Sequence, residues 1–429
     1  MTDLTHRRAD DRVRLVDPQG RPVAGTTVSV EQTRHAFGFG NIGFDFIDWL
    51  GGPSDEGPVD GRPVDNAGSP PQVEALAEDW LGLFNTMTLP FYWRGFEPVQ
   101  GRPDTTRLRR TAEWFAGQGV TVKGHPLLWH TLAPEWLLSL DDAAVEASIR
   151  ARIRREVTDF AGVVDLWDAI NEVVILPVFT AEDNAVTRLA GRLGQVEMVR
   201  LAFDEARAAN PNARLVLNDF DLSADYERLI EDCLTAGIRI DAIGLQTHMH
   251  QGYRGEEQVW GILERFARFG LPLQLTETTL LSGELMPPHI VDLNDYQRPS
   301  WPSTPEGEAR QADEIVRHYR TVVAHPAVES LTYWGLTDHG AWLGAPSGLI
   351  RTDGSKKPAY DALHNLIRGE WWHPETRLTT DADGVVPIRG FAGRYRINSP
   401  AGVAEVELLS GAGSVTVTLE SAPAALSGF

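Results

Sequence analysis

Short runs of apolar residues alternate with longer amphipathic segments through most of this chain. The amphipathic segments repeat their apolar positions at helical spacing, as over 145–160, 195–209 and 308–323. The short runs have the length and composition of buried strands. The eight runs are 37–42, 86–90, 120–129, 163–171, 214–219, 242–248, 271–277 and 331–336. Eight strands that alternate with helices predict an α/β fold of the (β/α)8 or TIM-barrel class.

The two ends of the chain carry a different pattern, in which apolar and polar residues alternate one by one. Near the start, 13–16 and 27–30 alternate on either side of a turn at 17–22, which is typical of a β-hairpin. Near the end, 393–397, 403–408 and 414–419 also read as strands. Neither end has enough strands to bury a core alone, so we expect both to join in one small β-sandwich. The predicted domains are 1–34 and 372–429 for the two sandwich segments and 35–371 for the barrel.

Composition excludes several classes of partner. The chain has 429 residues and a formal charge of −21, with no Lys/Arg-rich run, so nucleic acid and anionic membranes are repelled. Cys233 is the only cysteine, which excludes an intrachain disulfide and a cysteine metal cluster. No apolar run reaches transmembrane length, and the first residues lack an export signal, so we expect no membrane association and a cytoplasmic protein.

Two glutamates follow strand-like apolar runs and suggest the chemistry. Glu172 comes after 163–171, and Glu277 ends 271–277. Burying an anion at a strand end is energetically costly, so each carboxylate is expected to have either a hydrogen-bonding or charged partner or a catalytic role. In a (β/α)8 barrel the carboxyl ends of all strands meet at one mouth, where residues distant in sequence converge. Hydrolysis of a glycosidic bond requires such a pair of carboxyl groups.

Five motifs around these glutamates resemble, in order, the strand-end motifs of family ten glycoside hydrolases, the xylanase family. They are Gly124-His125-Pro126-Leu127-Leu128-Trp129-His130, Trp167-Asp168-Ala169-Ile170-Asn171-Glu172, Ile243-Gly244-Leu245-Gln246-Thr247-His248, Leu275-Thr276-Glu277 and Tyr333-Trp334-Gly335-Leu336-Thr337-Asp338. Lys357-Pro358-Ala359-Tyr360 matches the family's final helix. The resemblance covers roughly 35–371 and implies a TIM barrel with a retaining, two-step mechanism on β-linked sugars.

The resemblance also implies a role for each matching residue. Glu172 matches the general acid/base and Glu277 the nucleophile, with carboxyl groups about 5–5.5 Å apart in a retaining enzyme. Asn171 matches the amide that holds the sugar 2-hydroxyl, and His248 with Gln246 matches the pair that hydrogen-bonds the nucleophile. The remaining matches line the cleaved sugar's subsite: His125 and Trp129 its floor, Trp334 and Trp342 its aromatic walls.

The resemblance implies no cofactor, and the residues argue against a metal. His125, His130, His248 and His250 are the histidines that could ligate one, but no pair has helical i, i+4 spacing beside a carboxylate. We therefore expect neither metal nor cofactor.

The chain departs from the family where substrate is chosen. The family's Glu-Asn-x-Met-Lys-Trp run, whose polar residues grip the next sugar, reads here Thr88-Leu89-Pro90-Phe91-Tyr92-Trp93. Leu132 stands where the family has glutamine, and Thr278-Thr279 replaces its Leu-Asp. The long loop 282–305 is either a lid over the same mouth or a solvated insertion.

These departures favour a short or aglycone-bearing β-glycoside, with Tyr92 as a substrate-binding residue. Xylo-oligosaccharides and plant saponins, the latter as for tomatinase-like members of the family, both fit this description. The alternatives are a conventional endo-1,4-β-xylanase and a non-catalytic sugar-binding barrel. The sugar, the aglycone, exo or endo action, and the oligomeric state stay open.

Overall fold

The computed structural model describes residues 3–52 and 73–420, which form two compact units, 1–38 with 363–429 and 39–362. The predicted domain boundaries after residues 34 and 371 stay a prediction.

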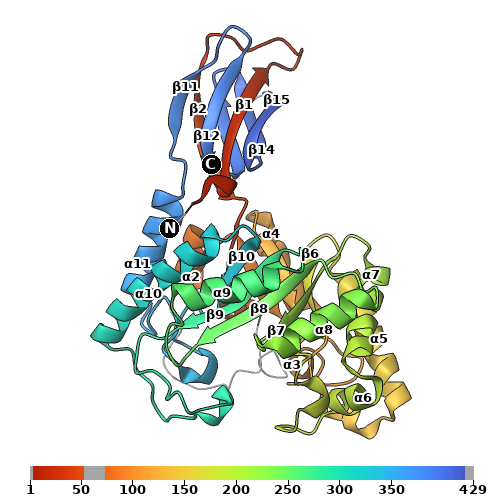
Figure 1. The fold of residues 1–429 in the computed structure, drawn as a ribbon. Coiled ribbons are helices and arrows are strands. Elements are labelled where there is room, and N and C mark those ends of the chain that lie inside the picture. Colours follow the sequence, from red (N-terminus) through yellow and green to blue (C-terminus); the bar gives the residue numbers. More distant parts are fainter. Residues whose placement is uncertain (1–2, 53–72, 421–429) are drawn as a thin grey trace. The chain divides into compact units, whose positions relative to one another are not determined.

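The larger unit is built on a closed barrel of eight parallel strands (Figure 1). The strands are β3 (Gly38–Ile42), β4 (Thr86–Pro90), β5 (Thr121–His125), β6 (Val164–Asn171), β7 (Arg214–Asp219), β8 (Ala242–Met249), β9 (Leu273–Leu280) and β10 (Val328–Tyr333). Their spatial order follows the sequence, with β9 and β10 paired and β10 beside β3. The predicted (β/α)8 barrel is confirmed.

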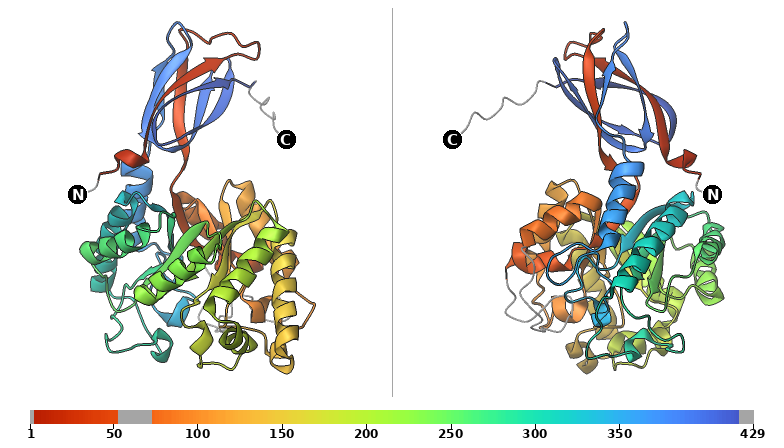
Figure 2. Two further views of the ribbon diagram at one scale, coloured as in Figure 1. Left: turned by 45° about the vertical axis from the view of Figure 1, so that its right-hand side comes forward. Right: turned by 90° about the vertical axis from the view of Figure 1, so that its left-hand side faces the viewer.

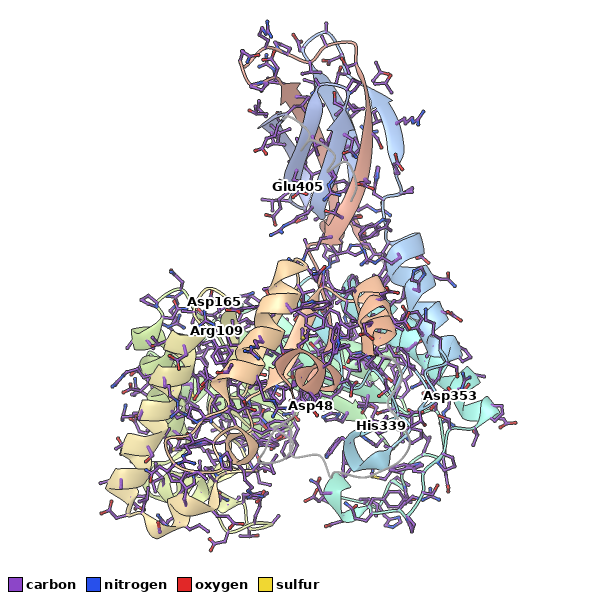
Figure 3. The ribbon with its side chains drawn as sticks, turned by 180° about the vertical axis from the view of Figure 1, so that it is seen from behind. Asp48, Arg109, Asp165, His339, Asp353 and Glu405 are labelled. Carbon is purple, nitrogen blue, oxygen red and sulfur yellow. The ribbon has the colours of Figure 1, made fainter. Side chains whose placement is uncertain are left out.

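Helices surround these strands (Figure 2). They are α1 (Ile47–Gly51), α2 (Val73–Leu83), α3 (Trp93–Phe96), α4 (Thr105–Gly117), α5 (Asp142–Asp159), α6 (Ala185–Leu193), α7 (Gln195–Ala209), α8 (Ala224–Thr235), α9 (Glu256–Ala267), α10 (Pro305–Ala324) and α11 (Pro358–His364). The start of α5 illustrates why they begin where they do, since the Asp141 carboxylate accepts the Ala144 N–H and caps the first turn. Figure 3 shows the side chains, including His339 in the segment that follows β10.

Several strand ends differ from the pattern in the sequence. The predicted run 120–129 forms a strand, β5, only as far as His125. Pro126 ends it because proline has no N–H to donate to a neighbouring strand. Strand β9 continues to Leu280, so Glu277 lies inside the strand rather than at its end. Glu172, in contrast, directly follows the last residue of β6.

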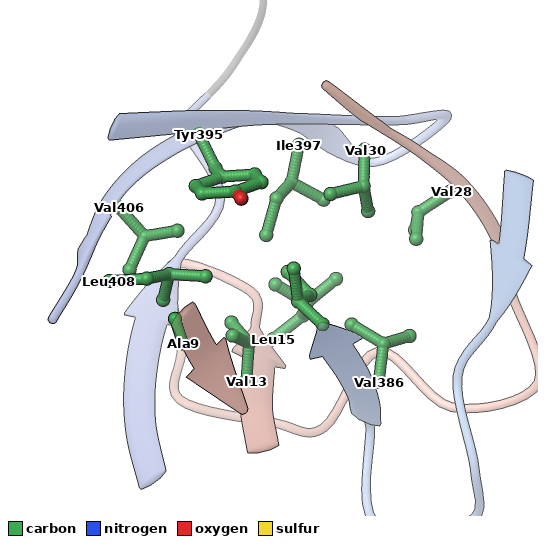
Figure 4. Close-up of a cluster of buried hydrophobic side chains, with 11 residues drawn as sticks. Ala9, Val13, Leu15, Val28, Val30, Val386, Tyr395, Ile397, Val406 and Leu408 are labelled. Carbon is green, nitrogen blue, oxygen red and sulfur yellow. The ribbon is translucent and has the colours of Figure 1, made fainter. Parts of the chain in front are cut away.

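The smaller unit is a sandwich of two sheets drawn from both ends of the chain. One sheet has the order β12-β1-β15 and the other β11-β2-β13-β14. The strands are β1 (Arg8–Val16), β2 (Thr27–His35), β11 (Thr376–Thr379), β12 (Val385–Phe391), β13 (Gly393–Ser399), β14 (Gly402–Leu408) and β15 (Gly411–Thr418). Alternate side chains of both sheets form its core: Ala9, Val13, Leu15, Val28, Val30, Val386, Ile388, Tyr395, Ile397, Val406 and Leu408 (Figure 4).

The predicted N-terminal hairpin is wrong, although both of its strands exist. β1 and β2 lie in different sheets and face each other across the core. The expected turn does form, since the Asp17 N–H donates to the Arg21 carbonyl. After Pro22 the chain crosses to the other sheet, because β1 pairs with β12 and β15 from the C-terminal segment instead.

Candidate active site

Glu172 has a backbone conformation that side-chain-bearing residues rarely adopt. Its φ is 57°, in the left-handed region. Its N–H donates to the carbonyl of Asn218 at 2.8 Å, which ties the turn after β6 to β7. Strained backbone of this kind persists where the surroundings enforce it and is concentrated at functional sites.

The Glu172 carboxyl group is half-buried and accepts hydrogen bonds from two neutral side chains. The Trp129 indole N–H donates to Oε2 at 2.7 Å, and Gln246 Nε2 donates to Oε1 at 3.2 Å. Burial, followed by the charge of Glu277, raises the pKa of Glu172 to about 8. A carboxyl group that keeps its proton near neutral pH can act as a general acid.

Glu277 is surrounded by donors on both oxygens. Asn218 Nδ2 donates to Oε1 at 3.0 Å, and His248 Nε2 lies 3.2 Å from Oε2. His125 Nε2 is 3.8 Å from Oε1. Hydrogen bonds to the charged form of a carboxylate favour that form. The two glutamates therefore occupy chemically different surroundings.

Asn218, which the sequence motifs did not single out, links the two halves of the site. Its Nδ2 donates to Asn171 Oδ1 at 2.8 Å as well as to Glu277, and its Oδ1 accepts the Thr276 hydroxyl at 2.6 Å. Gly244 leaves room for it, because a Cβ there would lie 2.4 Å from Asn218 Oδ1. The only sequence signal was its place at the polar end of a strand.

One continuous chain of hydrogen bonds joins the two carboxyl groups. Gln246 Nε2 reaches both Glu172 Oε1 and, at 3.1 Å, Asn171 Oδ1. Asn218 continues from Asn171 to Glu277. Four strands, β6 to β9, thus contribute to one polar network. A displacement of one side chain in it changes the hydrogen bonds of the others.

Beneath this network lies a second residue that the motifs left without a role. Asp168 pairs with Lys123 Nζ and with His125 Nδ1, each at 2.7 Å. Burial would raise the pKa of Asp168, but Lys123 and His125 hold it below its ordinary value. This buried group fixes the His125 ring with its Nε2 toward Glu277.

Aromatic side chains gather beside the polar network. Phe44 makes edge-on contacts with Tyr92 and Trp334, with centroids 6.0 and 5.7 Å apart. Tyr92 also lies 5.5 Å from Trp129, and Leu132 packs on the same cluster. Phe44 was not expected from the motifs. The hydroxyl of Thr88 is buried without a hydrogen-bond partner among the described residues, and Leu89 is fully buried.

The other predicted wall residue, Trp342, lies against His248 near the end of β8 and His250 just after it. Its ring centroid is 4.7 Å from that of His248 and 5.1 Å from that of His250. The structure therefore places all ten predicted site residues near one another, through direct contacts or shared neighbours. Their roles in catalysis and binding stay proposals.

The long loop after β9 packs around its own apolar core. Met286 and Trp301 are buried and contact Ala345 in the segment that carries Trp342. Lys357, fully buried, joins the two segments, because Nζ donates to Ser282 Oγ at 2.8 Å and lies 2.7 Å from Asp338 Oδ1. Residues 287–300 between these anchors are half-buried or exposed, so the lid and the solvated insertion both stay predictions.

Within 3–52 and 73–420, no three His, Cys, Asp or Glu side chains are grouped so that they could hold a metal ion. None of the helices in these residues combines the length and the apolar character needed to span a bilayer.

A closed (β/α)8 barrel with one glutamate directly after β6 and another on β9 is typical of the glycoside hydrolase class. The comparisons with known proteins give the family. Residues 83–366 match the model for glycosyl hydrolase family 10, which is more than half of the chain, and the chain belongs to that family.

Individual relatives are distant. Endo-1,4-beta-xylanase B of Thermotoga neapolitana is 28% identical over 320 residues, covering 70% of this chain and 86% of the relative. Anti-sigma-I factor RsgI6 of Acetivibrio thermocellus is 23% identical over 397 residues, covering 91% of this chain and 45% of that protein. Endo-1,4-beta-xylanase C of Paenibacillus barcinonensis is 25% identical, and this chain spans 30% of its length.

Among solved structures, xylanase 10B of Thermotoga petrophila RKU-1 in complex with xylobiose superposes with a TM-score of 0.59. The match covers 78% of this chain and 95% of that chain at 22% identity, and it supports the barrel fold.

Proposed function

We propose that the protein is a retaining β-glycoside hydrolase that works by double displacement. The observation that carries this proposal is the contrast between the two glutamates. Glu172, with its pKa raised to about 8, can hold a proton, whereas Glu277 accepts hydrogen bonds on both oxygens as an anion does. Two carboxyl groups in surroundings this different are typical of an acid and a nucleophile.

In the first step Glu277 attacks the anomeric carbon while Glu172 gives its proton to the departing oxygen. The glycosidic bond breaks, and a glycosyl ester forms on Glu277. In the second step Glu172, now ionised, takes a proton from water, whose oxygen attacks the anomeric carbon and releases Glu277. Asn171, held by Gln246 and Asn218, is placed to donate to the sugar 2-hydroxyl as charge develops on the ring.

For the substrate we favour a short or aglycone-bearing β-glycoside. Tyr92 stands where the family has a lysine, and it lies in an aromatic group with Phe44, Trp129 and Trp334. The acid and the amide that bind a distal xylose in the family are replaced by Thr88 and Leu89. Apolar rings favour the C–H face of one sugar or an apolar aglycone over a long polar chain.

Two alternatives have support of their own. The names of several relatives favour a conventional endo-1,4-β-xylanase acting on xylan. A non-catalytic sugar-binding barrel is kept because one relative is named an anti-sigma factor rather than an enzyme. The intact Glu172 and Glu277 argue against it.

Covalent labelling tests the mechanism. A 2-fluoro β-xyloside with a good leaving group should trap an ester on Glu277, located by peptide mass spectrometry, and Glu277→Gln should prevent labelling. Glu172→Ala should still cleave activated aryl xylosides, and azide should accelerate it and yield a β-azide. An α-azide product would mean inversion, and labelling at another residue would remove Glu277 from its role.

Substrate preference is tested by comparing kcat/KM for xylohexaose, an aryl β-xyloside and a saponin. Loss of about 3–5 kcal/mol of binding at the distal subsite corresponds to a hundred- to a few-thousand-fold lower kcat/KM on xylohexaose. The variant Thr88→Glu/Leu89→Asn/Tyr92→Lys, with and without a shortened 282–305 loop, shows whether these residues or the loop limit long chains. Equal efficiency of the native protein on xylohexaose and small glycosides would favour the endo-xylanase.

A further inference from the structure

The hydroxyl group of Thr279 lies between two imidazole rings next to the nucleophile. Its Oγ1 is 3.3 Å from Nδ1 of His248 and 3.3 Å from Nδ1 of His250. The same oxygen accepts the backbone N–H of Met249 at 3.2 Å. The far nitrogen of His248, Nε2, faces Glu277 Oε2. Thr279 therefore connects His250 with the nucleophile through His248.

Counting donors and acceptors fixes how the protons can be arranged. A hydroxyl oxygen has one proton to donate and two lone pairs, of which the Met249 N–H occupies one. A neutral imidazole has one N–H and one bare nitrogen. Thr279 can therefore donate to one imidazole Nδ1 and accept from the other, so the two histidines must have opposite tautomers.

Glu277 determines which histidine has which tautomer. An ionised carboxylate only accepts, so His248 must carry a proton on Nε2. In the neutral ring its Nδ1 is then bare and accepts the Thr279 hydroxyl proton. The remaining lone pair of Thr279 accepts from His250 Nδ1–H, which leaves His250 Nε2 without a proton.

The surroundings of His250 agree with this assignment. It is 1% exposed, and its Nε2 has no hydrogen-bond partner among the described residues. The rings of Trp342 and Trp301 lie beside it, with centroids 5.1 and 6.4 Å away. Burial and the neighbouring His248 lower the pKa of His250 to about 3, so it stays neutral. A buried acceptor without a partner is tolerated better than a buried N–H without one.

We propose that Thr279 and His250 are positioning residues that hold His248 as a neutral imidazole with its proton on Nε2. This inference rests on the proposed role of Glu277 as nucleophile. A second proton on His248 would occupy Nδ1, reverse the Thr279 hydroxyl and move the His250 proton to Nε2, where it meets no acceptor. The hydrogen-bonded series Glu277–His248–Thr279–His250, here called the relay, therefore resists formation of an imidazolium beside Glu277.

The residue at position 279 thus sets the charge next to the nucleophile. An aspartate there, as in the family motif, would accept from Nδ1 of both rings and favour a cationic His248. Formation of the glycosyl ester removes the charge of Glu277, so a cation beside it stabilises the reactant more than the product. The neutral relay avoids that cost in the first step.

Nitrogen NMR of the full 15N-labelled chain tests the relay without substrate, because protonated and bare imidazole nitrogens give well-separated signals. His250→Asn identifies the His250 signals by their loss. We expect a bare Nδ1 and a protonated Nε2 on His248, with the reverse on His250. Thr279→Ser should keep this pattern, and Thr279→Asp should protonate both nitrogens of His248. A native His248 protonated on both nitrogens, or a pattern unchanged by Thr279→Asp, would overturn the proposal.

Kinetics on an activated aryl β-xyloside provide the second readout. Thr279→Asp should lower kcat/KM, which reports the first step, about 10-fold, and should lower kcat less. His250→Asn keeps an N–H in the place of Nδ1 and should stay within about threefold of the native value, whereas His250→Phe should lose about 10-fold or more. Equal losses in these two His250 variants would contradict the relay. Failure of labelling at Glu277 would instead reject the proposed function and leave the NMR result standing.

Discussion

The indole N–H of Trp129 lies 2.7 Å from Oε2 of Glu172, and this hydrogen bond opposes the effects that keep Glu172 protonated. Burial and the charge of Glu277 raise the pKa of Glu172 to about 8, and the bond from Trp129 lowers it. The residue proposed as sugar-subsite floor therefore also tunes the proposed general acid.

This relationship predicts the alkaline limb of activity. Because the acid must be protonated, kcat/KM should be retained below the pKa of Glu172 and fall as pH rises through about 8. Trp129→Phe removes a bond to the charged form, so the limb should move to higher pH by about one unit, along with a general loss of activity. The check is a kcat/KM profile on a β-xyloside with a poor leaving group. A limb that stays in place would show that Trp129 does not set this pKa.

Glu172 should also make folding stability depend on pH. Its pKa is raised from 4.5 to about 8 in the folded protein, so between these values the native state binds more protons than the unfolded state. Stability contributed by this group is therefore lost as pH rises through that window. Glu172→Gln should be more stable than the native protein by a few °C at pH 9 and by less at pH 5, measured by calorimetry. An equal difference at both pH values would contradict the linkage.

Asn218 offers a test of the polar network. In Asn218→Asp a carboxylate oxygen replaces the Nδ2 donor and faces Glu277 Oε1, so like charges meet. We expect about a hundredfold or greater loss of kcat/KM with the fold retained by circular dichroism. Asn212→Asp adds the same charge at an exposed position between α7 and β7 and should leave activity unchanged. Comparable activity of the two variants would remove Asn218 from the site.

Two adjacent lysines allow a matched stability experiment. Lys357 is fully buried with Asp338, whereas the Lys356 side chain is 40% exposed and pairs with Asp79. Lys357→Met leaves the largely buried Asp338 carboxylate without its cation, with only the Gly348 N–H and the Ser303 hydroxyl as donors among the described residues, and should cost about 3 kcal/mol of unfolding free energy. Lys356→Met should cost no more than about 1 kcal/mol. Denaturant titration of both variants measures the difference, and equal costs would show that the buried pair does not hold the two segments together.

The shared sandwich predicts the effect of removing the tail. Deletion of 376–429 takes away every strand that pairs with β1 and β2 and exposes Val13, Leu15, Val28 and Val30. We expect the truncated protein to be insoluble, as measured by the soluble fraction after expression. A soluble, active truncation would mean that the tail is dispensable for folding.

Local pattern predicted the elements well but not their partners. Eight apolar runs and ordered motifs were sufficient for the barrel and the family, because period and strand order translate directly into (β/α)8 topology. The prediction of an N-terminal hairpin was wrong because alternation of apolar and polar residues identifies a strand but not the strand it pairs with. Strand β15, which pairs with β1, comes from the other end of the chain. The roles of Asn218 and His250 depend on hydrogen bonds between strands, which no single motif contains.

The pairing of β1 and β2 with strands from the far end of the chain imposes an order on folding during synthesis. Both strands are made before the barrel, but their partners begin only at Thr376. At ~5–20 residues per second the intervening chain takes on the order of 20–70 s to make. During that interval the barrel can form while the apolar faces of β1 and β2 stay uncovered. Of the two units, the sandwich is thus the later to close, and the interval before it closes is when a chaperone would matter most.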